Sequence, residues 1–167
     1  MYKRQSDDAQ LRSLIFWMMG SFGRATWFTV LPASLLMMVS ILVLLSQSQN
    51  IDRLQLGESE AMHMGVDIKR TKRILILTTA CAVGAGVSLA GIIGFVGLVV
   101  PHLARMLIGA RHHVLLPTSA ILGACLMILV DLTSRSLIAP AELPVSIVTS
   151  GLGAPFFLWL IAKARPQ

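Results

Sequence analysis

The sequence predicts an all-α fold, a polytopic membrane helical bundle with about five transmembrane helices. Hydrophobic residues make up 55% of the chain and charged residues only 13%, which is well below the roughly 25% that is usual in a soluble domain. The mean hydropathy is +0.76. Long stretches without a charged residue alternate with short basic clusters, as expected for helices that cross a bilayer.

The longest charge-free stretch covers residues 74–104. As one straight helix it would extend about 46 Å, whereas the hydrocarbon core of a bilayer is about 30 Å thick. Basic residues flank it on both sides, with Lys72 and Arg73 before it and Arg105 after it. Because basic residues favour the cytoplasmic side, we expect a hairpin that crosses twice and turns near its glycines.

Three further charge-free stretches, at residues 25–51, 114–130 and 143–162, are long enough to cross the bilayer or nearly so. The expected organisation is an outer-side segment with a short helix at 1–24, a transmembrane domain at 25–163 and a cytoplasmic tail at 164–167. Counting crossings places residues 50–73 in the cytoplasm and residues 131–142 on the outer side.

The cytoplasmic loop at 50–73 has the pattern of a folded docking surface. Apolar residues alternate with Glu58, Glu60 and a histidine, and Gly57 and Gly65 interrupt the pattern. Two short helices on the inner face of the membrane would fit this spacing. A loop that is merely solvated remains the alternative.

Small residues are concentrated in the hairpin and include Gly91, Gly94 and Gly97. In lipid such residues let helices approach closely, so we expect tight packing here, with pore lining as the alternative. Pro101 has no N–H to donate within a helix. The second arm of the hairpin should therefore be short or bent.

Catalytic and metal-binding motifs are missing from the sequence, which has no HExxH, GxSxG, Walker lysine loop or CxxC pair. His112 and His113 have no carboxylate or cysteine at ligand spacing, so solvated turn residues are expected rather than a metal site. Cys81 and Cys125 fall inside spans, where an apolar packing role is expected. The net charge of +6 fits cytoplasmic flanks of spans better than nucleic-acid binding. We predict no catalytic residue, no metal and no directly bound cofactor.

Three charged residues gather between the last two spans: Asp131, Arg135 and Glu142. Asp131 and Arg135 are four residues apart, so on one helix they would share a face and pair. One interpretation is a simple interfacial ion pair. The other is that Arg135 meets an acidic partner protein on the outer face.

The chain closely resembles the permease subunits of ABC importers for iron-siderophores, haem and vitamin B12. The resemblance covers about residues 7–163, and the segments LGE at 56–58 and FWMMGS at 16–21 also resemble this family. Four motifs carry it, in the family's order and spacing: GIIGFVGLVVPH at 91–102, VLLP at 114–117, PAELPV at 140–145 and GAPFFLW at 153–159.

This resemblance implies a multi-pass protein of the bacterial inner membrane that moves iron chelates, ferric siderophore or haem, by ATP-driven alternating access. Family members have ten spans per subunit and work as a homodimer with two cytoplasmic ATPase subunits and a periplasmic substrate-binding protein. The chain would be the C-terminal half, a natural half or a truncated gene model, with residues 74–104 as spans seven and eight. ATP would be hydrolysed by the partner subunit. Vitamin B12 is an alternative cargo, because the motifs do not separate these substrates.

The resemblance also implies roles for individual residues. Arg135 would match the outer-face arginine that pairs with a glutamate of the binding protein. The loop that docks into the ATPase would include Glu58, Ser59, Glu60, Ala61 and Gly65. The translocation pathway and dimer interface would include Met18, Met19, Gly20, Phe22, Val145, Thr149 and Gly153. Remote alternatives are an intramembrane enzyme that depends on His102 and an assembly subunit without transport activity.

Overall fold

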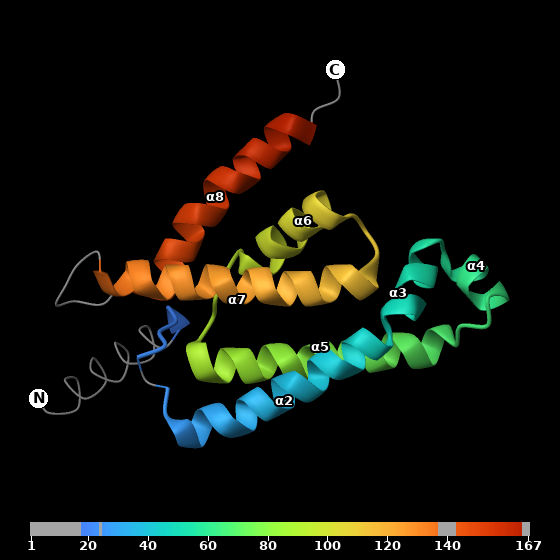
Figure 1. The fold of residues 1–167 in the computed structure, drawn as a ribbon, viewed down its shortest axis with the longest axis horizontal. Helices are drawn as coiled ribbons and strands as arrows, with labels where there is room; N and C mark the ends of the chain where they lie inside the picture. The colour runs from blue at the N-terminus through green and yellow to red at the C-terminus, as the bar shows by residue number, and fades with distance from the viewer. Residues whose placement is uncertain (1–17, 24, 137–142, 165–167) are drawn as a thin grey trace, which may run out of the picture. The chain divides into compact units, whose positions relative to one another are not determined.

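The computed structural model describes residues 18–23, 25–136 and 143–164, and every regular element in these ranges is an α-helix (Figure 1). The all-α prediction is therefore confirmed for this part of the chain. Glu142 and residues 165–167 of the predicted tail lie outside the described residues, as does most of the expected outer-side helix. The helices are α2 (Trp27–Ser46), α3 (Ser48–Gln55), α4 (Glu58–His63), α5 (Ile68–Ala90), α6 (Val96–Ile108), α7 (His112–Ser136) and α8 (Val145–Ala164).

Each charge-free stretch contains an apolar helix, and the stretch at 74–104 contains parts of two. Among the described residues, α2, α5 and α7 are long and apolar enough to cross a membrane, whereas α6 and the apolar part of α8, Val145–Leu158, are shorter. The expected break in the hairpin lies at residues 91–95, between α5 and α6. Pro101 lies inside α6, which has 13 residues, so the second arm is short as expected. The number of crossings stays a prediction.

The chain divides into two compact units. We call Thr26–Gly86 with Val100–Leu122 the loop unit, because it contains α3 and α4. We call Met1–Ala25 with Val87–Val99 and Gly123–Gln167 the terminal unit. Each unit is described by itself, within its described residues.

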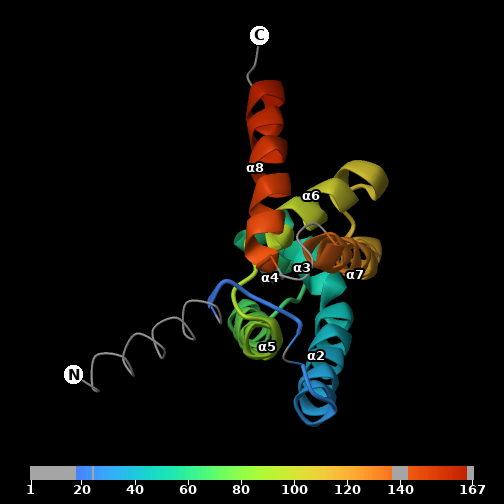
Figure 2. The ribbon, with the colours of Figure 1, turned by 90° about the vertical axis from the view of Figure 1, so that its left-hand side faces the viewer.

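In the loop unit α2 lies beside α5, as the two views in Figure 1 and Figure 2 show. A Cβ added at Gly86 of α5 would lie 3.9 Å from Cε of Met37 on α2, an ordinary contact. The connection between these helices holds α3 and α4. Gly57, with φ of 116°, separates α3 from α4, and Gly65, with φ of 80°, follows α4. The two short helices and the two glycine breaks predicted from the sequence are thus confirmed.

In the terminal unit, a short N-terminal segment satisfies main-chain groups of two helices. The Ser21 N–H donates to the Ala90 carbonyl oxygen at the end of α5, at 3.1 Å. The N–H groups of Val145 and Ser146, which begin α8, donate to the carbonyl oxygens of Gly20 and Met19 at 3.1 and 3.2 Å. The first N–H groups of a helix have no partner within that helix, so this segment supplies what α8 lacks. We call these contacts the Gly20 junction.

Gly20 itself is required at this junction for two reasons. Its φ of +76° lies in the left-handed region, which side chains other than glycine rarely adopt. A Cβ at this position would also lie 2.9 Å from the Ala90 carbonyl oxygen, too close for unstrained packing.

Two of the sequence motifs meet where Phe95 packs against α8. Phe95 is the only described residue other than glycine with positive φ, at 66°, a conformation that costs energy for a bulky side chain. Its ring makes an edge-to-face contact with Phe157, with centroids 6.0 Å apart and planes at 64°. A Cβ on Gly153 would lie only 2.5 Å from the Phe95 Cβ. Gly153 therefore makes room for this aromatic pair.

The tight glycine packing expected in the hairpin is only partly present. Gly91 is buried at the turn after α5. Among the described residues, nothing lies within 4 Å of a Cβ built on Gly94 or Gly97. The close approach expected at these two positions is therefore not made within the described part of this chain, because the backbone there faces open space.

Replacing Gly153 by alanine should destabilise the terminal unit. The added methyl group cannot avoid Phe95, and overpacking of this kind costs roughly 1–3 kcal/mol. Gly151→Ala is the matched control on the same helix, since nothing lies within 4 Å of its added Cβ, and it should be neutral or gain up to about 1 kcal/mol. Thermal unfolding of the two variants in detergent measures the difference. Equal stability of both variants would contradict this packing.

Candidate functional site

The surface formed by α3 and α4 combines acidic and apolar side chains. Glu58, Ser59 and Glu60 are exposed in the first turn of α4, and large apolar side chains, Leu56 and Met62, are exposed beside them. Ala61 is 0% exposed and anchors the helix. Its carbonyl oxygen accepts a hydrogen bond from the Val66 N–H at 3.0 Å, across the turn that contains Gly65. An ordered surface with exposed apolar side chains is typical of a protein contact.

An ion pair links this surface to α5. The Lys72 ammonium group contacts the Glu58 carboxylate, and the two side chains are 49% and 64% exposed. An exposed pair of this kind contributes about 0–1 kcal/mol. Glu58 can therefore exchange this partner for another at little cost.

A second contact links α3 to α7, and sequence reasoning missed it. Oδ1 of Asp52 accepts a hydrogen bond from the His112 main-chain N–H at 3.0 Å and lies 2.6 Å from the His112 Nδ1. His112 begins α7, so the carboxylate caps a helix N-terminus, where negative charge is favourable. The prediction that His112 is a solvated turn residue was wrong, since its side chain is only 12% exposed. His113 is exposed as expected.

The surroundings of Asp52 act on its carboxyl group in opposite directions. Partial burial acts to raise its pKa. The hydrogen bonds from the His112 main chain and side chain, and the charges of His112 and His113, outweigh burial and hold the pKa of Asp52 below its ordinary value. Asp52 is therefore an anion at neutral pH, as the contact requires.

The predicted pairing at the end of α7 is confirmed. Nε of Arg135 lies 2.9 Å from Oδ2 of Asp131. Leu143 contacts the last turn of α7. Its N–H donates to the Ser134 carbonyl oxygen at 3.3 Å, and its carbonyl oxygen accepts a hydrogen bond from the Ser134 hydroxyl. The Arg135 side chain is 49% exposed although it makes this ion pair.

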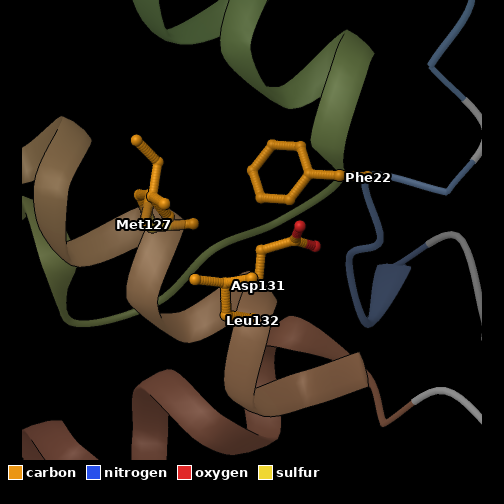
Figure 3. Close-up of a pocket in the computed structure, with 5 residues that line it drawn as sticks. Phe22, Met127, Asp131 and Leu132 are labelled. Carbon is orange, nitrogen blue, oxygen red and sulfur yellow. The ribbon is translucent and has the colours of Figure 1, made fainter. Parts of the chain in front are cut away.

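Phe22 and α7 line an open cavity of about 320 Å³ in the terminal unit. Figure 3 shows the Phe22 ring and the Asp131 carboxylate turned toward one another across it. The remaining lining is apolar and comes from Met127, Ile128 and Leu132. Sequence reasoning singled out Phe22 but not these α7 residues.

The residues expected to form a pathway or dimer interface differ in accessibility. Val145, Thr149 and Gly153 are buried within the terminal unit, which gives them a packing role. Met19 and Gly20 take part in the Gly20 junction, and Met18 is exposed. Their role in a pathway or dimer interface stays a prediction. Met18 is the most exposed of these residues and therefore has the most surface available for a partner.

Cys81 and Cys125 are free and exposed on their helices, so the packing role expected for them is not seen within the described part of the chain. In those same residues no group of three or more His, Cys, Asp or Glu side chains is arranged to hold a metal ion.

Comparison with known proteins identifies the family. Residues 1–163 match the FecCD transport family, a range that includes residues 1–6, which the sequence resemblance had left out. The hemin transport system permease protein HmuU of Yersinia pestis is 50% identical over 162 residues, which are 97% of this chain and 48% of that protein. The vitamin B12 import system permease protein BtuC of Vibrio cholerae is 45% identical over 158 residues, 95% of this chain and 47% of that protein.

A solved structure has the same fold. It is described as a putative metal-chelate type ABC transporter in an inward-facing conformation, and it superposes with a TM-score of 0.86 at 41% identity, covering 92% of this chain and 49% of that one. The chain thus spans about half the length of the relatives it matches. Because the family match covers nearly the whole chain and the fold agrees with it, the chain belongs to the FecCD transport family.

Proposed function

We propose that this chain forms part of a membrane-spanning permease that imports an iron chelate, haem or a ferric siderophore, across the bacterial inner membrane. The observation that carries the proposal is the ordered acidic and apolar surface of α3 and α4, set between two helices long and apolar enough to cross a membrane. The family supports a transport role. The haem permease of Yersinia pestis and the metal-chelate transporter structure support the class of cargo.

Vitamin B12 is the second candidate cargo. Permeases for vitamin B12 match this chain over the same extent at 45% identity, close to the 50% of the haem permease. Uptake of labelled haemin, ferric siderophore and cyanocobalamin by cells that depend on this importer separates the two proposals. ATP-dependent uptake of haemin or siderophore supports the first, and uptake of cyanocobalamin alone supports the second.

The proposed mechanism places the chemistry outside this chain. A cytoplasmic ATPase subunit binds and hydrolyses ATP and moves the α3–α4 surface, and the apolar helices convert that motion into alternating access. A second permease copy completes the pathway, and a periplasmic binding protein delivers the cargo. The apolar helices carry few charges, which suits a wide route that binds a bulky substrate weakly.

Reversing the charge of α4 should prevent docking of the ATPase. In the double variant Glu58→Lys and Glu60→Lys, two exposed carboxylates become ammonium groups, and the new ammonium group at position 58 would face Lys72. We expect loss of the ATPase from the purified assembly, because like charges across an interface oppose association. Co-purification followed by quantitative gel analysis measures the bound ATPase.

A matched control keeps the charge of α4. Changing Glu58 and Glu60 both to aspartate shortens the two exposed side chains and leaves both carboxylates in place. This control should retain most of the ATPase. Full retention of the ATPase by the variant with lysine at both positions would remove the basis for the docking surface.

Arg135→Glu should weaken docking of the binding protein on the outer face. The substitution would replace an exposed cation by an anion near an acidic partner, and it would also place two carboxylates four residues apart on α7, which costs only about 0.2–0.5 kcal/mol. Binding to the permease in nanodiscs at low salt measures the effect. Asp131→Asn is the control, since it removes the negative charge beside Arg135 and leaves the guanidinium. If the Arg135→Glu variant binds the binding protein with unchanged affinity, the assignment of Arg135 as a docking residue is wrong.

A further inference from the structure

The loop unit contains two side-chain contacts of carboxylates that connect the α3–α4 surface to two different apolar helices. Asp52 on α3 contacts His112 at the start of α7, and Glu58 on α4 contacts Lys72 near the start of α5. The chain itself already joins α4 to α5 through Gly65 and the short turn that follows it. The link to α7 has no such support, because 60 positions separate Asp52 from His112.

The Asp52 contact is the better protected of the two. One carboxylate oxygen serves both the main-chain N–H and the imidazole of His112. The side chains of His112 and Asp52 are 12% and 34% exposed, against 49% and 64% for Lys72 and Glu58. Charge-assisted hydrogen bonds are stronger than neutral ones, and lower exposure reduces screening by salt. The N-terminal end of α7 adds a favourable dipole for the anion.

We propose that Asp52 is a positioning residue through which α7 follows the movement of the cytoplasmic loop. A displacement of α3 would carry the carboxylate with it, and the double contact would bring the first turn of α7 along. Without the contact, the ATPase could still move α3, α4 and α5, but α7 would follow incompletely. This inference rests on the proposed docking of the ATPase on α3 and α4.

The test compares transport with ATP hydrolysis in the assembled importer, reconstituted in liposomes with its ATPase and binding protein. The probe is haemin, or cyanocobalamin where the uptake test selects it. Asp52→Asn keeps the size of the side chain and removes its charge. We expect the ATPase to remain bound, hydrolysis to continue, and the amount of substrate moved per ATP to fall roughly ten-fold, as for loss of a charge-assisted hydrogen bond.

The matched control is Asp67→Asn. Oδ1 of Asp67 accepts a hydrogen bond from the Arg70 N–H at 3.0 Å within the first turn of α5, so it is also a helix-capping carboxylate, and this contact stays within one helix. Its ratio of transport to hydrolysis should match the native protein. His112→Gln removes the imidazole and keeps the main-chain N–H that donates to Asp52, so it should reproduce part of the effect of Asp52→Asn. Combining the two substitutions should add little to Asp52→Asn alone, because both act on the same contact.

The outcomes separate the inference from the function on which it rests. A native ratio of transport to hydrolysis in the Asp52→Asn variant, with the ATPase bound, would overturn the inference and leave the docking proposal standing. A parallel loss of assembled complex and of both rates would also overturn it, because Asp52 would then be needed only for stability. Absence of any bound ATPase in the native preparation would overturn both proposals.

Discussion

The hydrogen bonds of the Gly20 junction are the constraint on which the terminal unit depends. Main-chain groups in an apolar environment need partners within the protein, and a broken helix leaves several without one. Here α5 ends at Ala90 and α8 starts at Val145, and the segment around Gly20 serves both ends. Only a residue without a side chain fits between them. The junction therefore explains why a short non-helical segment lies beside the break in the hairpin.

In the loop unit, side-chain carboxylates instead of main-chain carbonyl groups accept hydrogen bonds from the N–H groups at helix starts. Asp52 caps α7 from another element, whereas Asp67 caps α5 locally. The first arrangement makes the position of α7 depend on the position of α3. An ordered surface that is tied to two apolar helices can pass a displacement on to them, as the proposed docking of an ATPase requires, whereas a solvated loop cannot. This combination favours the coupling interpretation of residues 50–73.

Local patterns in the sequence predicted the local features of the structure. The length of the charge-free stretch predicted the break near Gly91, the glycine spacing predicted α3 and α4, and the four-residue spacing predicted the pair of Asp131 and Arg135. Long-range contacts were missed, because neither periodicity nor spacing reports which turns meet. The Asp52 contact and the packing of Phe95 on Gly153 belong to this class. At Gly94 and Gly97 the expected close approach is not made within the described part of the chain, since small residues permit close approach but do not supply the neighbour.

The central claim is that α4 contacts an ATPase subunit in the working importer. A photoreactive amino acid at Ser59, an exposed position between the two α4 glutamates, tests it directly in the assembled protein. The account predicts a covalent product between the permease and the ATPase subunit, formed with and without ATP and identified by mass spectrometry. Products with lipid or with the binding protein, and none with the ATPase, would contradict the account.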